Sequence, residues 1–190
     1  IKSCLYTAGR GKFSNVQNAR INKTNFYVYD KELFILKLAG EIIKETNKAK
    51  KNNEKIAFRL NGTSDIDFIY LLEKYAQLDI ESIKENAVFY DYTKILGKVR
   101  KYKNHSNYHL TFSRAEDNNS VALSALNDGA NVSIVFRDGL PRFWRGYKVI
   151  DGDESDILMV YNKNVILGLQ AKGDGKKDKT GFVVDAIRPI

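Results

Sequence analysis

The chain has 190 residues, a length typical of one domain and sufficient to bury a sizeable core. Its hydrophobic content of 43% is ordinary for a globular protein and argues against a disordered chain, and no apolar run approaches the ~18 residues of a membrane-spanning helix. The formal net charge of +8 is consistent with a polyanionic partner such as nucleic acid, although many basic proteins bind no particular partner. The lack of a long apolar run gives no reason to expect a membrane partner.

Residues 1–52 are predicted to form an N-terminal helical segment. Ser14 can cap a short helix that runs through residue 21, and a second helical pattern opens at residue 30 or 31. In that second pattern Leu33, Leu36 and Ile43 fall on one face. The lysine-rich run at residues 48–51 is typical of a helix C-terminus, where cations interact favourably with the helix dipole.

Residues 53–137 alternate between strand and helix patterns. Strands are expected at residues 55–60, 87–90, 108–112 and 131–136, with helices at 66–76, 92–103 and 121–126. Strand, polar turn, helix and strand in succession is the signature of βαβ units with a parallel sheet. We therefore expect an α/β fold, either a partial β/α barrel or an open parallel sheet.

The pattern changes in residues 138–190, where shorter strands are expected at 147–150, 157–161, 165–169 and 182–184. The second and third of these favour a hairpin around residues 162–164, and residues 173–180 read as a basic, glycine-containing loop. The whole chain, 1–190, is thus interpreted as a single α/β domain with a mixed C-terminal extension.

In parallel α/β folds, ligands bind at the carboxyl ends of the strands, and this rule selects candidate residues without any motif. Carboxylates there can act as metal ligands or general bases, and cations can steady a phosphate. The expected catalytic residues are Asp65, Asp91, Lys94, Glu116 and Lys172. The expected ligand-binding residues are Asn61, Ser64, Tyr90, Tyr92, Ser113, Arg114 and Arg137. For Ser64 and Asp65, an ordinary helix cap is the alternative.

Metal binding is suggested by the acidic run at residues 151–156, in which Asp151, Asp153 and Asp156 offer hard oxygen ligands for a divalent cation. A solvated acidic turn is the alternative, as is an ion-pair network with cations such as Lys172. The two histidines, His105 and His109, are expected on different elements and so do not predict a shared metal.

Two stretches combine cations with aromatic residues, which is how single-stranded nucleic acid is held without sequence preference. The first is a basic helix, whose candidate nucleic-acid contacts are Lys98, Arg100, Lys101 and Lys103. The second is Phe143-Trp144-Arg145. The alternative is that the lysines only solvate a helix face and that Trp144 packs in the core.

Four stretches together resemble the motifs of a known family: residues 59–65 (RLNGTSD), 89–94 (FYDYTK), 107–113 (NYHLTFS) and 169–173 (LQAKG). They are similar to an uncharacterised phage- and plasmid-encoded family whose namesake is the mycobacteriophage gene-eighty-eight protein. The resemblance implies a mobile-element origin and a partial α/β barrel, but no activity.

Similar proteins hold further cysteines just before the segment that matches Cys4-Leu5-Tyr6, an arrangement reminiscent of radical-SAM-like phage proteins. By this resemblance Cys4 would be one cluster ligand, but iron–sulfur clusters need several thiolates, and this sequence contains one. The sequence begins at Ile1, so residues upstream of it would change that count. With one cysteine and no visible signal peptide, we expect the protein in the host cytoplasm.

Three functional hypotheses follow. The first is a mobile-element enzyme that acts on nucleic acid or on another phosphate-bearing ligand, with a divalent metal as one way to engage the carboxylates. The second is a non-catalytic module that binds nucleic acid or a host partner. The third is a radical-SAM-like protein with a degenerate or truncated cysteine cluster. Convergence of Asp65, Asp91, Glu116 and Lys172 in one pocket would favour the first hypothesis over the second.

Overall fold

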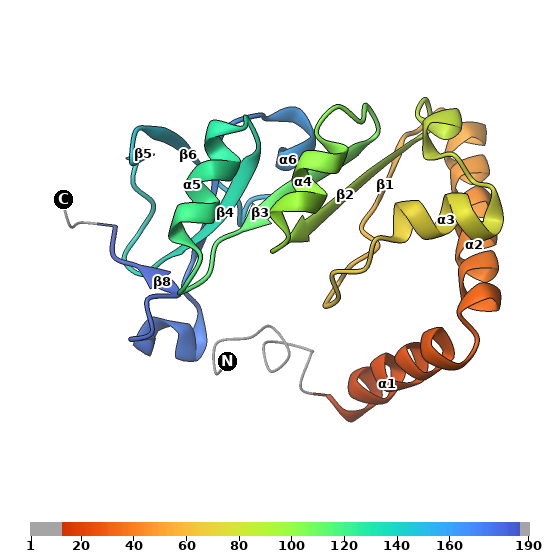
Figure 1. The fold of residues 1–190 in the computed structure, drawn as a ribbon, viewed down its shortest axis with the longest axis horizontal. Coiled ribbons are helices and arrows are strands. Elements are labelled where there is room, and N and C mark those ends of the chain that lie inside the picture. The colour runs from red at the N-terminus through yellow and green to blue at the C-terminus, as the bar shows by residue number, and fades with distance from the viewer. Residues whose placement is uncertain (1–12, 187–190) are drawn as a thin grey trace. The chain divides into compact units, whose positions relative to one another are not determined.

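A computed structural model describes residues 13–186 of the chain. These residues contain six α-helices and eight strands, which form a mostly parallel sheet in the order β1-β2-β3-β4-β7-β6-β5, with β8 beside β4 (Figure 1). β1 and β5 stand at opposite ends of this order, so the sheet is open and not closed into a barrel. The expected α/β class is confirmed in its open-sheet form.

The described chain divides into two compact units, residues 13–89 and 90–186, and the division falls inside strand β2 (Ala87–Thr93). The expectation that residues 1–190 form a single domain therefore stays a prediction. The expected cluster ligand Cys4 lies outside the described residues.

Two consecutive helices open the first unit. α1 (Ser14–Tyr29) contains no buried residue, whereas α2 (Lys31–Lys51) buries one stripe of its surface. α2 begins where the Asp30 carboxylate accepts a hydrogen bond from the Leu33 backbone N–H at 3.2 Å, which satisfies one of the unpaired amides at a helix start. The buried stripe follows the helical repeat and consists of Ile35, Ala39, Ile42, Thr46 and Ala49.

The rest of the first unit places a short strand pair beside α2 and α3. β1 (Ile56–Phe58) pairs in parallel with the start of β2, and the rings of Phe58 and Phe89 stack with centroids 5.2 Å apart. α3 (Phe68–Ala76) is capped by Asp67, whose carboxylate accepts from the Tyr70 N–H. The 3-10 helix η3 (Ile80–Ile83) leads into β2. Ser64 and Asp65 are therefore not the caps of this helix.

The second unit contains the remaining strands. β3 (Tyr108–Ser113), β4 (Asn131–Phe136), β7 (Ile166–Gln170) and β6 (Tyr147–Asp151) run parallel, and β5 (Phe143–Trp144) adds an antiparallel edge. β8 (Val183–Val184) pairs with the end of β4, whereas β3 pairs with its start. The C-terminal segment thus pairs with Val135 and Phe136 of β4, beyond the residues with which β3 pairs.

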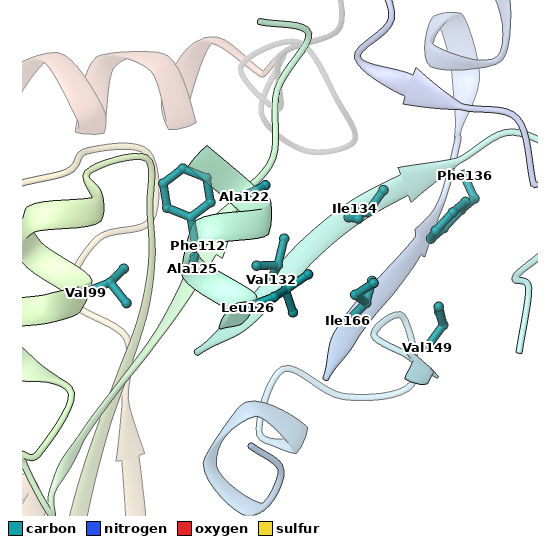
Figure 2. Packing of buried hydrophobic residues seen from close by; sticks show 10 residues of the cluster. All are labelled: Val99, Phe112, Ala122, Ala125, Leu126, Val132, Ile134, Phe136, Val149 and Ile166. Atoms are coloured by element: carbon teal, nitrogen blue, oxygen red, sulfur yellow. The ribbon is translucent and has the colours of Figure 1, made fainter. Parts of the chain in front are cut away.

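Helices cover both faces of this part of the sheet. α4 (Leu96–Tyr102) and α5 (Asn119–Asn127) pack on one face, where Phe112, Ile134 and Phe136 are fully buried (Figure 2). α6 (Leu158–Tyr161) packs on the other face through Met159. β7 contributes to both cores because side chains alternate along a strand: Ile166 faces α5, whereas Val165 and Leu167 face α6.

The segment 157–161 is helical, so its predicted strand and hairpin are wrong. The Ser155 hydroxyl accepts a hydrogen bond from the Ile157 N–H, and the Ser155 carbonyl accepts one from the Leu158 N–H. From β4, the Asn131 side chain then donates to the carbonyls of Met159 and Asn162. These contacts stabilise a helical turn that the apolar sequence of residues 157–161 does not specify by itself.

Strand β2 runs three residues further than predicted. The predicted site residues Asp91 and Tyr92 therefore lie inside the strand, and only Lys94 follows its end. Asp91 is fully buried there and accepts a hydrogen bond from the Tyr108 hydroxyl at 3.0 Å. A buried carboxylate is tolerated where hydrogen-bond donors contact it. Here the donor is the hydroxyl of Tyr108, which lies on the next strand, β3.

Candidate functional site

Two arginines follow neighbouring strands of the second unit directly, and both had been selected as ligand-binding residues. Arg114 comes after β3 and is only 6% exposed. Its backbone N–H donates to Ser133, its Nε donates to the Asn119 side chain at 2.7 Å, and its Nη1 donates to the carbonyl of Phe182 at 2.7 Å. Arg114 thus connects the end of β3 to the C-terminal segment.

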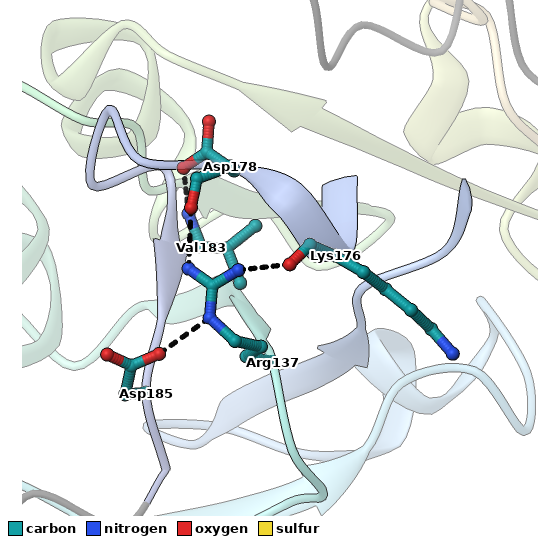
Figure 3. Close-up of polar contacts among 5 residues, drawn as sticks. All are labelled: Arg137, Lys176, Asp178, Val183 and Asp185. Atoms are coloured by element: carbon teal, nitrogen blue, oxygen red, sulfur yellow. Dashed lines mark hydrogen bonds and ion pairs between the residues drawn. The ribbon is translucent and has the colours of Figure 1, made fainter. Parts of the chain in front are cut away.

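Arg137, directly after β4, makes a larger set of contacts with the same segment (Figure 3). Its backbone N–H donates to Val184 at 2.9 Å, and its Nε pairs with the Asp185 carboxylate at 2.7 Å. Nη1 donates to the carbonyl of Lys176, and Nη2 donates to the carbonyl of Asp178 at 2.7 Å. One planar side chain therefore holds residues 176–185 at several points.

Asp178 fixes the same segment from within. Its carboxylate accepts hydrogen bonds from the Thr180 hydroxyl at 2.8 Å and from the Val183 N–H at 3.2 Å. Burial raises the pKa of Asp178, but these hydrogen bonds lower it by more, so the pKa lies below its usual range. The charged form is therefore favoured by the folded structure.

Two guanidinium groups and two carboxylates interact around Arg114. Burial lowers the pKa of this guanidinium, the charges of Glu116 and Asp178 raise it, and the charge of Arg145 lowers it, with a net lowering. Arg145 lies at the turn of the β5–β6 hairpin and stacks on the Trp144 ring, 5.0 Å from its centroid. The charges of Glu116 and Asp178 offset those of Arg114 and Arg145, so these four groups together carry no net charge.

The outer face of the anchored segment carries lysines. We call residues 172–180 the basic loop, because Lys172, Lys176, Lys177 and Lys179 in it are all exposed. Its 3-10 helix η4 (Gly173–Lys177) turns directly after β7. At the start of the loop Lys172 pairs with Asp153 at 2.8 Å, so three of the lysines remain for an external anion. The arrangement suits phosphate groups, which basic side chains bind without regard to base sequence.

The predicted catalytic residues of the second unit lie at different places. Asp91 contacts Tyr108 at the start of β3, whereas Glu116 acts on Arg114 beyond the end of that strand. Six residue steps from Tyr108 to Arg114 correspond to about 20 Å along a strand. Lys172 pairs with Asp153, and Lys94 is exposed after β2. These positions give little support to one catalytic pocket built from Asp91 and Glu116.

In the first unit, the predicted site residues close a local loop. Asn61 is 2% exposed, and its side chain accepts from the Ser64 hydroxyl at 2.7 Å and from the Ile66 N–H at 2.9 Å. The Asn61 amide also donates to the Ile66 carbonyl at 3.0 Å. Asn61 and Ser64 therefore shape the turn after β1, and Asp65 lies half-buried within it.

The tyrosines and the acidic run occupy the α6 side of the second unit. Tyr90 and Tyr92 pack against the core around Met159, and the Tyr92 hydroxyl donates to Asp156 at 3.0 Å. Asp151 accepts from the Asp153 N–H. Burial raises the pKa of Asp153, but hydrogen bonds from Lys172 and from the Gln170 N–H lower it by more.

The Ser113 hydroxyl lies 3.4 Å from that of Ser133. Among residues 13–186, no group of three or more histidine, cysteine or acidic side chains could hold a metal ion. The metal site proposed at Asp151, Asp153 and Asp156 stays a prediction.

The predicted nucleic-acid contacts on α4 differ in environment. Lys98 is 6% exposed, which keeps it from reaching an external phosphate. Arg100 pairs with Asp128 at 2.7 Å, and Lys101 lies over the Tyr102 ring. Lys103 is exposed just beyond the helix. Three of the four predicted contacts are therefore exposed, but Arg100 is held in an ion pair, Lys101 lies over a ring, and Lys98 is buried.

Sequence reasoning named Arg145 only within the stretch Phe143-Trp144-Arg145, and it missed the three outer lysines of the basic loop as candidate contacts. The signal was present, since residues 173–180 read as a basic loop, but nothing in the sequence placed this loop beside Arg114 and Arg137. That placement depends on the pairing of β8 with β4.

Comparison with known proteins places the chain in a family. The model of a family described as gene product 88 matches residues 1–186, nearly the whole chain. No curated protein and no solved structure matches the chain. Within residues 13–186, no helix has the length and apolar character needed to cross a membrane.

Proposed function

From the premise that the chain belongs to the gene product 88 family, a phage family of unknown function, we propose that it is a nucleic-acid-binding module whose basic loop contacts phosphates. The observation that carries the proposal is the anchoring of this loop: Arg137 and Asp178 fix its backbone while Lys176, Lys177 and Lys179 stay exposed.

Anchoring matters because ordering a flexible basic segment on binding costs conformational entropy. A loop already held by Arg137 avoids much of that cost, and its lysines can release counterions from the nucleic acid. The β5–β6 hairpin adds an aromatic component: Phe143 is 60% exposed beside Trp144 and Arg145. Exposed rings of this kind stack on unpaired bases, so the proposed ligand is single-stranded nucleic acid.

An enzyme acting on nucleic acid or a phosphate-bearing ligand receives less support. Arg114 and Arg137 donate hydrogen bonds to backbone carbonyls. Tyr108, whose hydroxyl contacts Asp91, lies about 20 Å along the strand from Arg114. Asp65 as a metal ligand or general base, and Lys94 as a phosphate contact, remain predictions.

The radical-SAM-like alternative, with Cys4 as a cluster ligand, also remains a prediction. Iron content and colour of the anaerobically purified protein would test it.

The test of the proposal is a salt series. Binding of fluorescent single-stranded DNA and RNA is measured by anisotropy, and log Kd is plotted against log salt concentration. In the triple variant Lys176→Gln, Lys177→Gln, Lys179→Gln, we expect weaker binding and a slope reduced by about 2–3, because each lost phosphate contact removes ~0.7–0.9.

The matched control removes the same charge elsewhere. Lys44, Lys50 and Lys51 are exposed on α2, and their replacement by Gln should change the slope by less than ~1. Arg137→Lys keeps the net charge but loses the planar fork, so it should weaken binding by loosening the loop. Equal slopes for the two triple variants would show that net charge alone drives binding, and the loop proposal would fail.

A further inference from the structure

A separate cavity of about 390 Å³ lies at the amino ends of β3 and β4, at the opposite end of these strands from the basic loop. Its walls come from the α4–β3 connection, the turn before β4, and the end of α6. Both histidines of the chain, His105 and His109, line it. The volume is within the range of small-molecule sites, which is ~300–1,000 Å³.

Three cations and one carboxylate line the cavity: Arg100, Lys103, Lys163 and Asp128. Arg100 pairs with Asp128 at 2.7 Å and donates to the Ser124 hydroxyl at 3.0 Å, which fixes its guanidinium and offsets the one negative charge. Lys103 and Lys163 are both exposed; Lys103 follows α4, and Lys163 follows α6. The net positive lining favours an anionic ligand.

One wall is aromatic and rigidly supported. The Tyr102 and Tyr108 rings meet edge to face with centroids 5.1 Å apart, and the His105 ring lies 5.9 Å from Tyr102. The Tyr108 hydroxyl is fixed by the buried Asp91 at 3.0 Å. A planar heterocycle can pack against the half-buried imidazole at this wall.

Another part of the lining is polar and is held by hydrogen bonds. Asn131 lines the cavity, donates to the carbonyls of Met159 and Asn162, and accepts from the Val165 N–H at 3.2 Å. This buried amide holds the end of α6 in place and so positions Lys163. Asn104 and Asn162 add amide groups that suit the hydrogen-bonding edge of a base.

We propose that this cavity binds a nucleoside monophosphate, with the phosphate between Lys103 and Lys163 and the base against His105. The two lysines suit the phosphate, the aromatic side chains suit the face of the base, and the amide groups suit its hydrogen-bonding edge. The site shares no residue with the basic loop, so the inference does not rest on the proposed function.

The histidines give a direct readout, because the chain has only two and both line the cavity. Tag-free protein is titrated with AMP, GMP, CMP and UMP, and the imidazole C2–H signals are followed by proton NMR. Both signals should shift and saturate with at least one nucleotide. Adenosine and inorganic phosphate, titrated separately, should each bind at least ~10-fold more weakly, since each supplies only part of the contacts.

The double variant Lys103→Gln, Lys163→Gln should weaken nucleotide binding by about 10- to 100-fold, which is the effect of losing charge-assisted contacts. The triple variant of the basic loop serves as control and should bind the nucleotide normally. No shift with any of the four nucleotides would overturn the inference, as would unchanged affinity in the double variant or phosphate binding as tight as nucleotide binding. Loss of nucleic-acid binding in the loop variant alone would not bear on it.

Discussion

Asp178 shows how one carboxylate can couple the basic loop to pH. Its hydrogen bonds from Thr180 and Val183 outweigh the effect of burial, so its pKa is lower in the folded protein than in the unfolded chain. A depressed folded pKa contributes stability that is fully present above the unfolded value of ~3.9. That contribution is lost as the pH falls from there through the lower folded pKa.

Asp178→Asn should therefore reduce the free energy of unfolding by about 1–3 kcal/mol at pH 7, because the Val183 N–H loses a charged acceptor. Below pH ~4 the difference from the wild type should shrink, since the wild-type carboxylate itself becomes protonated. Urea denaturation at pH 7 and at pH 3 measures both differences.

Asp138, exposed after β4, offers the matched control: Asp138→Asn should stay within ~0.5 kcal/mol of the wild type at pH 7. If the loss for Asp178→Asn were the same at both pH values, the role of the charged carboxylate would be refuted.

At the scale of elements, β7 owes its place in the sheet to Gly168. A Cβ atom at this position would lie 2.7 Å from Val149 Cγ1 and 2.9 Å from Leu140 Cδ2, closer than carbon atoms pack. β7 lies between β4 and β6 and has little freedom to move. Gly168→Ala should therefore destabilise the protein by about 1–3 kcal/mol through overpacking.

Gly97 in α4 provides the control, because its replacement by alanine should change the free energy of unfolding in the opposite direction. A Cβ there meets no atom within 4 Å, and alanine is the better helix former, so Gly97→Ala should stabilise the protein by up to ~1 kcal/mol. Both glycines belong to the second unit, which makes their chemical denaturation curves directly comparable. A neutral or stabilising Gly168→Ala would contradict the close approach of Val149 and Leu140.

The same elements show what the sequence could and could not specify. The strands at 131–136 and 165–169 follow from continuous apolar runs, which are typical of buried parallel strands. The apolar stretch 157–161 suits a strand equally well, and contacts from Ser155 and Asn131 decide for a helix. Asn131 lies 28 residues from Met159 in the chain, so no local pattern contains this contact.

At the scale of the molecule, the rule that polar residues gather at strand ends predicted where Arg114 and Arg137 lie. It did not predict what their side chains bind. Their guanidinium groups bind the returning C-terminal segment, and Arg137 reaches Asp185, 48 residues away. Net charge is similarly uninformative about position: Lys2, Arg10, Lys12 and Arg188 carry half of the +8 and lie outside the described residues. The basic loop is thus defined by the fold and not by the overall charge.

Burial is also unevenly distributed along the chain, which predicts a gradient of local stability. α1 contains no buried residue, whereas every residue of β4 except Val135 is buried. Amides exchange with solvent through local openings whose cost depends on the buried contacts that are lost. In hydrogen–deuterium exchange followed by mass spectrometry, we expect peptides from α1 to exchange on the order of 100-fold faster than peptides from β4 and β7.

α2 provides the internal comparison, because it follows α1 directly and buries the stripe from Ile35 to Ala49. Its amides should exchange at intermediate rates, slower than those of α1. Protection of α1 equal to that of β4 would contradict the exposure of this helix and would indicate a surface that covers it. Addition of single-stranded nucleic acid should slow exchange in the basic loop and leave α1 unchanged, because the proposed phosphate contacts are Lys176, Lys177 and Lys179 and none of them lies on the helix.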